Sequence, residues 1–409
     1  MSKTDRGRSG QSRIGLALAG GGPEGAVYEI GALYAVSEAL PDLDLNRLDV
    51  YVGVSAGAFL SANLANGLTP AQMCRAIVKS DPGEHPFVPT TFLTPATRQW
   101  LQGGLRTPSL LLDALRAYLT DPADESLLES LTRLGRALPV GFFDNRPIRN
   151  YLERIYSMKG RSNDFRALQS KLFVIAADLD SGTAIKFGSE EWDHVPISVA
   201  VQASSALPGL YPPVEIDGRH YVDGVLLKTL HASVALEEGA NLLLCLNPIV
   251  PVDTSKAVTE GIMKRGKLVD RGLPTVLAQT FRTLIHSRLE VGMATYQNRF
   301  GGADVVLLEP KRDDYRMFFT NIFSFSSRRS LADHAYQRTR VELRQRFDEL
   351  SPILEGHGVH LSPEALAASN GLWDKVDLQE PEARSFPRPS RVLGDLESAL
   401  DRVDSILEG

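Results

Sequence analysis

Ser55 lies in Gly53-Val-Ser-Ala-Gly57, which has the pattern G-x-S-x-G. An apolar run at 49–54 precedes it, and a stretch rich in Ala, Gly and Ser follows. This context predicts a strand, a sharp turn and a helix that together expose the serine hydroxyl, as in a nucleophile elbow. The pattern therefore predicts nucleophilic catalysis by Ser55, with a buried serine in an ordinary turn as the structural alternative.

A glycine-rich segment, Gly20-Gly-Gly-Pro-Glu-Gly25, follows a second apolar run at 14–19. Glycines before a helix let backbone N–H groups point into open space, where the helix dipole favours negative charge. Such groups suit either a bound phosphate or the oxyanion of an acyl-transfer intermediate. The spacing also fits a dinucleotide-binding loop, but such a loop needs an acidic residue at the end of the second strand. In this chain Asp49 stands at the start of the second strand, which argues against a dinucleotide site.

A serine hydroxyl becomes a good nucleophile only when a nearby base accepts its proton. In Arg219-His-Tyr-Val-Asp-Gly-Val225, Asp223 ends a predicted short strand just before Gly224, so its carboxylate can project from a turn. Burial would raise the pKa of that carboxylate and make it a stronger base. Asp-Gly is also common in plain turns. None of the eight histidines lies in a context that nominates it as the base.

The elements that would position these residues alternate along the chain. Apolar runs predict strands at 14–19, 49–54, 171–177, 183–187, 241–246 and 304–308, with helices at about 23–40 and 56–66. Strands and helices joined by tight glycine turns predict an α/β fold with a parallel sheet covered by helices. We expect a flexible basic tail at 1–13, a catalytic domain at 14–310 with a helical lid or insertion at 81–145, a helical extension at 311–380, and a linker with an amphipathic helix at 381–409.

Composition excludes several classes of protein. With 409 residues, 43% hydrophobic and 23% charged, the chain is typical of a globular protein. The net charge of −6 argues against a nucleic-acid binder that acts through phosphate attraction. No apolar stretch approaches the ~18 residues that span a bilayer, and two cysteines, Cys74 and Cys245, suit a reducing, cytoplasmic compartment. No metal-ligand cluster is present in the sequence, and we expect no metal and no cofactor.

The three motifs, in this order, resemble the patatin-like phospholipase family. The segment from Ala203 to Val214, followed by Tyr221-Val-Asp-Gly224, also resembles that family's stretch before its catalytic aspartate. The resemblance covers about 14–308. It implies a three-layer α/β sandwich around a central, mainly parallel sheet, and cleavage of the acyl esters of lipids.

The resemblance also implies residue roles: a Ser–Asp dyad without histidine, in which Ser55 is the nucleophile and Asp223 is the general base. The oxyanion hole would be formed by the N–H groups of Gly20, Gly21 and Gly22. The remaining motif glycines are Gly25, Gly53, Gly57 and Gly224.

Three positions depart from the family pattern. Glu24 stands where the family usually has Lys or Arg, Val225 where it has Gly or Ala, and Thr229 where an Asn is common. An acidic side chain at Glu24 is expected to disfavour an anionic headgroup there. Val225 neighbours the expected base without replacing it.

A surface for lipid contact is expected because the substrate would come from an aggregate. Four phenylalanines fall at 318–325, and the segment 328–347 combines an apolar face with several arginines, including Arg340. A basic amphipathic helix beside aromatic residues can lie on a lipid surface. A core-packed helix with a solvated arginine face is the commoner structure.

We therefore expect a lipid ester substrate, transient contact of a cytoplasmic protein with a membrane surface, and no nucleic acid. The C-terminal helix leaves open a homo-oligomer or a protein partner. Two alternatives remain at this point: an α/β-hydrolase-type esterase with a Ser–His–Asp triad acting on non-lipid esters, and a catalytically silent relative that binds membranes or partners.

Overall fold

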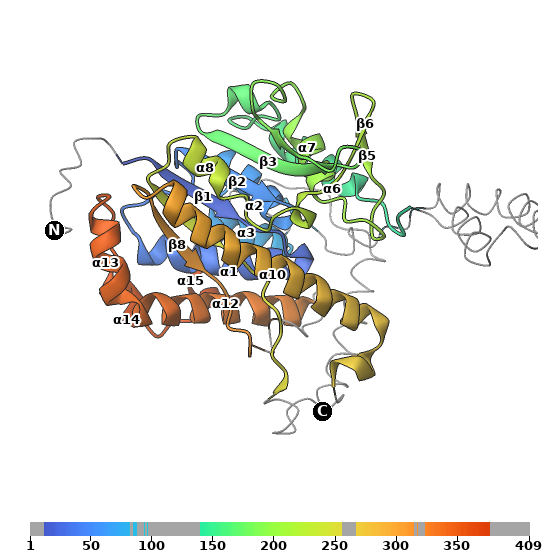
Figure 1. Cartoon of the computed structure of the whole chain (residues 1–409). Helices are drawn as coiled ribbons and strands as arrows, with labels where there is room; N and C mark the ends of the chain where they lie inside the picture. The colour runs from blue at the N-terminus through green and yellow to red at the C-terminus, as the bar shows by residue number, and fades with distance from the viewer. Residues whose placement is uncertain are drawn as a thin grey trace, which may run out of the picture.

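A computed structural model describes residues 12–81, 85–87, 94, 96, 140–255, 267–314, 317 and 324–376. The strands of these residues form one sheet in the order β5-β6-β3-β2-β1-β7-β8, with β4 paired to β3 (Figure 1). Their bounds are β1 Ile14–Leu18, β2 Val50–Val54, β3 Lys171–Asp178, β4 Ala184–Phe187, β5 Val214–Ile216, β6 Arg219–Asp223, β7 Leu242–Leu246 and β8 Asp304–Leu308. The structure adds β5, which the sequence pattern did not predict.

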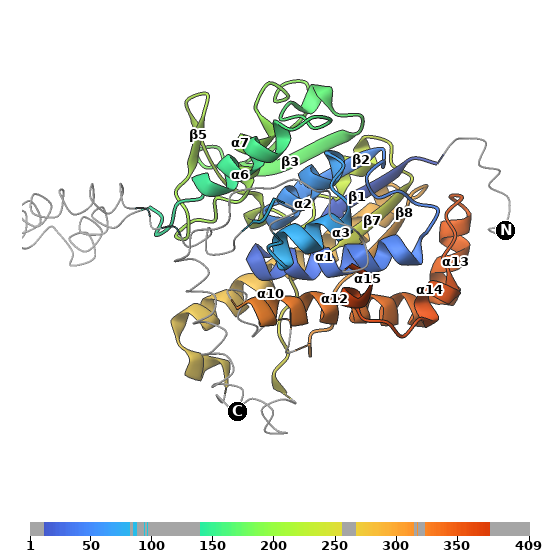
Figure 2. The same cartoon turned by 180° about the vertical axis from the view of Figure 1, so that it is seen from behind.

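The sheet is mainly parallel. β1 pairs in parallel with β2 and β7, β2 with β3, and β7 with β8, whereas β4 and β6 run antiparallel to β3. Helices cover both faces, which gives the three-layer α/β architecture that the family resemblance implies (Figures 1 and 2). The carboxyl ends of β1 and β2 therefore meet at one edge of the sheet, where open α/β sheets commonly bind ligands.

Alternating side chains of β1 divide the core into two parts. Leu16 and Leu18 pack into one hydrophobic cluster, and Ala17 and Ala19 into the other. The first cluster lies under α1 (Gly22–Ala39), α2 (Ala56–Ala65), α3 (Pro70–Met73), α6 (Arg146–Tyr156), α7 (Ile197–Ser204) and α12 (Phe325–Gln345). The second lies under α8 (Ser233–Glu237) and α10 (Leu273–Arg299), which the sequence analysis did not predict.

The C-terminal helices dock on α1 rather than projecting from it. α12 lies along α1 in both views, and a Cβ at Gly31 would collide with the carbonyl oxygen of Ala332 (Figures 1 and 2). The rings of Tyr34 and Tyr336 meet edge to face, 5.8 Å between centroids. α13 (Phe347–Glu355), α14 (Pro363–Ala367) and α15 (Leu372–Val376) follow, and their buried residues join the same cluster.

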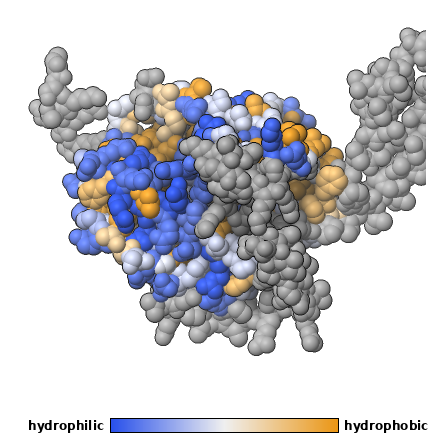
Figure 3. All heavy atoms as spheres, turned by 90° about the horizontal axis from the view of Figure 1, so that it is seen from below, coloured by the Kyte–Doolittle hydropathy of each residue, from blue (hydrophilic) through white to orange (hydrophobic). Residues whose placement is uncertain are grey.

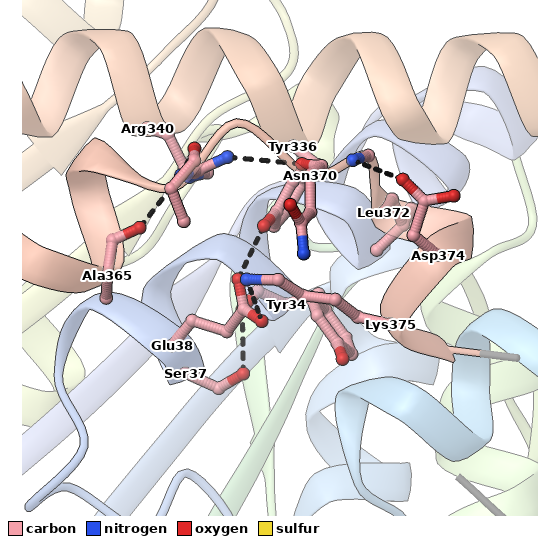
Figure 4. A network of polar contacts seen from close by, with 12 residues as sticks. Tyr34, Ser37, Glu38, Tyr336, Arg340, Ala365, Asn370, Leu372, Asp374 and Lys375 are labelled. Carbon is pink, nitrogen blue, oxygen red and sulfur yellow. Dashed lines mark hydrogen bonds and ion pairs between the residues drawn. The ribbon is translucent and has the colours of Figure 1, made fainter. Parts of the chain in front are cut away.

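Polar contacts also connect α1, α12 and the helices that follow α12 (Figure 4). Glu38 of α1 accepts a hydrogen bond from the Tyr336 hydroxyl (2.5 Å) and pairs with the ammonium of Lys375 (2.7 Å). Arg340 donates to the carbonyl oxygen of Ala365 (2.8 Å) and to that of Ala368. We call Tyr34, Glu38, Tyr336, Arg340 and Lys375 the α1–α12 seam.

α12 is thus a core-packed helix, but one detail of that alternative is wrong. The expected solvated arginine face includes Arg344, which is exposed, but it does not include Arg340, which is 3% exposed, or Arg328, which is 1% exposed. Both guanidinium groups donate to backbone carbonyls, Arg340 as above and Arg328 to Val78 (3.2 Å). Backbone carbonyls can satisfy a buried guanidinium because it offers five donors in a fixed plane. Seen from below, hydrophilic residues cover much of the coloured surface, and hydrophobic residues gather in patches along its upper part and at its right side (Figure 3).

Several predicted segments lie outside the described residues: most of the tail at 1–13, most of the lid or insertion at 81–145, the phenylalanines at 318–323, and the linker and helix at 381–409. The domain boundaries stay predictions. Within the described ranges, no helix combines the length and the apolar character needed to cross a bilayer.

Candidate active site

Ser55 sits in a strained turn between β2 and α2. Its backbone has φ 53° and ψ −119°, a conformation that non-glycine residues rarely adopt outside functional sites. A Cβ at Gly57 would collide with the carbonyl group of Leu18, and one at Gly53 would lie 2.5 Å from Ala58 Cα. Both glycines of the motif are therefore required by close backbone approach, as the nucleophile-elbow prediction expects.

Asp223 reaches Ser55 through the antiparallel pairing of β6 with β3. In the sheet register Val54 pairs with Ile175, and the next residue, Ala176, pairs with Asp223. The end of β2 and the end of β6 thus lie on either side of the same point of β3. This register brings together two residues that are 168 positions apart in the sequence.

Asp223 is a buried carboxylate with neutral hydrogen-bond donors. It is 2% exposed, and its Oδ1 accepts the N–H of Val225 at 2.9 Å. Burial raises the pKa of Asp223 to about 7, although hydrogen bonds from the Ser55 side chain and the Val225 N–H oppose the rise. A carboxyl group with this pKa can both accept and return a proton near neutral pH.

Two helices begin beside Ser55, so the positive ends of their dipoles lie at the cavity. α1 starts at Gly22 and α2 starts at Ala56, and both residues line the same cavity as Ser55. Within the described part of the chain, no acceptor takes the N–H of Gly21, Gly22 or Ala56. These groups are available to an oxyanion in the cavity.

The other glycines serve the packing around the loop. Gly20 is buried behind the cavity lining, where a Cβ would lie 2.9 Å from Val225 Cγ2. A Cβ at Gly25 would lie 3.0 Å from Pro248 Cγ, and one at Gly224 would lie 2.5 Å from the Ile175 carbonyl oxygen. Of the three predicted oxyanion glycines, Gly21 and Gly22 line the cavity and Gly20 does not.

The cavity measures about 620 Å³ and is lined mainly by apolar side chains. They come from several elements and include Phe59, Phe87, Ile148, Phe281 and Met317. A mostly apolar cavity with a few polar groups at one point is the usual form of a small-molecule site. Its size and polarity suit an apolar ligand that reaches Ser55.

Glu24, the first departure from the family pattern, faces an arginine. Glu24 and Arg282 of α10 both line the cavity. Burial raises the pKa of Glu24, and the charge of Arg282 opposes that rise. The acidic side chain is therefore partly compensated by a cation from another helix.

Histidine is absent from the cavity lining, although all eight histidines lie in the described part of the chain. His231 lies close to Asp223 in sequence, and its Nε2 is 3.4 Å from the Gly224 carbonyl oxygen. Burial lowers the pKa of His231 to about 4, so it is neutral at physiological pH. No histidine is placed to act as the base of a triad.

The family pattern of the patatin-like phospholipases matches residues 16–236, more than half of the chain and including Ser55 and Asp223. The chain belongs to the patatin-like phospholipase family. Members of this family are lipid acyl hydrolases. Val225, the second departure, leaves the patatin-like arrangement intact, because its N–H donates to Asp223 and its side chain packs against Gly20.

Relatives of this patatin-like chain are longer proteins. An uncharacterized NTE family protein of Mycobacterium tuberculosis is 27% identical over 240 residues, which is 57% of this chain and 30% of that protein. Another from Mycobacterium bovis is 28% identical over 238 residues, with the same shares. The match thus spans about 30% of the length of these curated relatives.

Two solved structures are also similar. VipD from Legionella pneumophila is 12% identical, covers 82% of this chain and 67% of its own, and has a TM-score of 0.36. The type III effector protein ExoU is 16% identical, covers 82% and 53%, and has a TM-score of 0.32.

Sequence reasoning missed two residues of this patatin-like site. Ser204, at the end of α7, accepts a hydrogen bond from the Ser55 N–H at 2.8 Å. The only signal was the family-like segment that begins at Ala203, which gave no role to its individual residues. Arg282 was missed because α10 was not predicted.

Proposed function

We propose that this chain is a lipid acyl hydrolase in which Ser55 is the nucleophile, Asp223 is the general base, and the N–H groups of the glycine loop stabilise the oxyanion. The observation that carries the proposal is the contact between Ser55 and a buried carboxylate whose pKa is raised to about 7. The apolar cavity around them supports a substrate with an acyl chain. Family membership supports a lipid rather than a polar ester.

In the acylation step, the Ser55 Oγ attacks the ester carbonyl carbon while its proton passes to an Asp223 carboxylate oxygen. The negative oxygen of the tetrahedral intermediate faces the N–H groups of Gly21, Gly22 and Ala56 at the two helix starts. Collapse breaks the bond to the alcohol, which leaves with the proton from Asp223. Water then attacks the acyl-enzyme, gives its proton to Asp223, and Ser55 recovers that proton as the fatty acid leaves.

The structure argues against the triad alternative, because no histidine lines the cavity. The silent alternative was motivated by Glu24, by Val225 and by the predicted C-terminal helix, which lies outside the described residues. This alternative loses support because the charge of Arg282 compensates that of Glu24. It also loses support because Val225 leaves Asp223 in contact with Ser55.

Contact with a lipid surface belongs to this proposal, and exposed apolar side chains indicate where it occurs. The 3₁₀ turn at Leu268–Arg271 and α10 expose large apolar residues that recur at helical spacing, including Leu273 (68%), Leu277 (46%), Phe281 (51%) and Leu284 (59%). Phe281 also lines the cavity, so the apolar stripe continues into the site. An exposed apolar face beside a lipid-binding cavity suits contact with a membrane surface.

The central test is covalent labelling with a fluorophosphonate, together with hydrolysis of phospholipid vesicles. We expect the wild type to be labelled on Ser55 and to release fatty acid, and Ser55→Ala to do neither. The matched control is Ser205→Ala, since Ser205 lines the same cavity beside the dyad. Labelling of Ser205 in place of Ser55, or full turnover by Ser55→Ala, would refute the proposal.

A further inference from the structure

One segment, Ser204–Ala206, contacts both members of the proposed dyad. The N–H of Ser55 donates to Ser204 Oγ at 2.8 Å. Two residues later, the carbonyl oxygen of Ala206 accepts the N–H of Asp223 at 3.0 Å. The backbone N–H groups of the proposed nucleophile and base thus donate hydrogen bonds to the same short segment at the end of α7.

Ser204 is itself fixed, which makes it a rigid anchor. Its side chain is fully buried, and its hydroxyl donates to the carbonyl oxygen of Ile175 at 2.5 Å. Ile175 is the β3 residue that pairs with Val54, directly before Ser55. With its proton committed to Ile175, the hydroxyl oxygen is left to accept the N–H of Ser55.

This contact matters because the turn at Ser55 is strained. A residue held at φ 53° persists only where surrounding contacts hold it there. Without an acceptor, the Ser55 N–H would be a buried donor with no partner, which costs free energy and favours a rotated turn. The same contact removes the Ser55 N–H from the donors available to the oxyanion and leaves that role to the starts of α1 and α2.

We propose that Ser204 is a positioning residue: its hydroxyl holds the strained backbone of Ser55 so that the nucleophile lies between Asp223 and the oxyanion donors. This inference rests on the proposed function. It adds to that function a residue that touches neither substrate nor the reacting atoms.

The test compares Ser204→Ala with Ser198→Ala. Ser198 lies on the same helix, is equally buried, and has its hydroxyl bonded to Asn163 at 2.9 Å, away from the dyad. For Ser204→Ala we expect kcat and the rate of fluorophosphonate labelling per folded molecule to fall by about 10-fold to 100-fold, with KM little changed. For Ser198→Ala we expect both rates to stay at the wild-type value.

A purely structural role predicts something different: both variants lose stability, and both keep the wild-type labelling rate per folded molecule. That result would overturn the inference. Should Ser204→Ala fail to fold, Ser204→Cys replaces it in the test, because cysteine keeps the size of the side chain and only a weak acceptor. Its labelling rate should lie between the rate of the wild type and that of Ser55→Ala. A wild-type rate in Ser204→Cys would overturn the inference equally.

The labelling assay also separates this inference from the proposed function. A wild type that is not labelled on Ser55 would refute the proposed function. A wild type that is labelled, beside an unimpaired Ser204→Ala, would refute only the role of Ser204.

Discussion

The edge of the sheet that carries Ser55 and Asp223, which we call the catalytic edge after its proposed function, and the α1–α12 seam both contain buried ionisable groups. The two regions surround these groups with different partners. At the seam, Glu38 has the Tyr336 hydroxyl and the Lys375 ammonium, and Arg340 has a set of backbone carbonyls. At the catalytic edge, Asp223 has the Ser55 hydroxyl and one N–H, both neutral donors.

The presence or absence of a cationic partner therefore determines whether a carboxylate in this protein contributes to stability or to the proposed chemistry. A carboxylate beside a cation and a hydroxyl donor, as Glu38 is, helps to hold two helices together. A carboxylate without a cation holds its proton more tightly, which costs stability at neutral pH and creates a base. Changes in the two regions should therefore separate activity from stability.

The largest effect is expected for Asp223→Asn. Removing the base should lower kcat on a soluble p-nitrophenyl ester by about 1000-fold or more, because the Ser55 proton has no acceptor. At pH 8 the same variant should unfold at higher urea than the wild type, since a buried negative charge is lost. Glu38→Gln at the seam should do the reverse, with lower stability and unchanged turnover per folded molecule. Loss of stability in Asp223→Asn would contradict the distinction.

A second prediction concerns pH and the same carboxyl group. Because only ionised Asp223 accepts the proton, kcat should fall by about 10-fold per unit as the pH drops below 7. The profile is measured on the soluble ester with stability checked at each pH. A profile that stays flat down to pH 5 would exclude Asp223 as the base.

The effect on stability has the opposite sign. The pKa of Asp223, about 7 in the folded protein, is higher than the ~3.9 of an unfolded aspartate. Its contribution to stability is therefore fully present below pH ~4 and is lost as the pH rises through 7. Relative to Asp223→Asn, the wild type should lose on the order of 3 kcal/mol between pH 4 and pH 8.

Much of the catalytic edge could be predicted from sequence, because local motifs encode it. Gly53, Ser55 and Gly57 stand within five residues, and the strain of the turn dictates their types. Asp223 followed because the Asp-Gly turn at the end of a strand is also local. Ser204 could not be predicted, because its role depends on a contact with a residue 149 positions away.

The same reasoning explains why the packing of α12 was only partly predicted. The apolar spacing of Leu331, Ala335 and Leu343 indicates a packed face of α12, and the structure buries all three. The burial of Arg340 was not predictable, because most of its acceptors are backbone carbonyls of α14 and of the residues that follow it, which a side-chain pattern does not specify. β5 has three residues, too few for a clear pattern.

A third prediction addresses the seam directly. Arg340→Met should lower the free energy of unfolding by about 2 kcal/mol, because several buried carbonyls lose their donor. Turnover of the soluble ester per folded molecule should not change. Arg338→Met is the matched control on the same helix, since its side chain is 37% exposed and its ion pair with Asp314 is long, at 3.7 Å. Equal losses in urea denaturation of the two variants would show that burial of Arg340 contributes little.

The smallest effect is expected on the outer surface, where neither buried charge nor strain is involved. Leu277→Asp combined with Leu284→Asp places charges on the exposed stripe of α10 and should change stability by less than about 0.5 kcal/mol. Hydrolysis of the soluble ester should stay at the wild-type rate, while hydrolysis of phospholipid vesicles should fall about 5-fold because the stripe no longer enters the lipid surface. Val341→Asp is the control, since Val341 is the exposed apolar residue of α12 (37%) on the seam helix. If Val341→Asp impairs vesicle hydrolysis and the α10 variant does not, the lipid-facing helix is α12, and the seam serves catalysis at the membrane as well as stability.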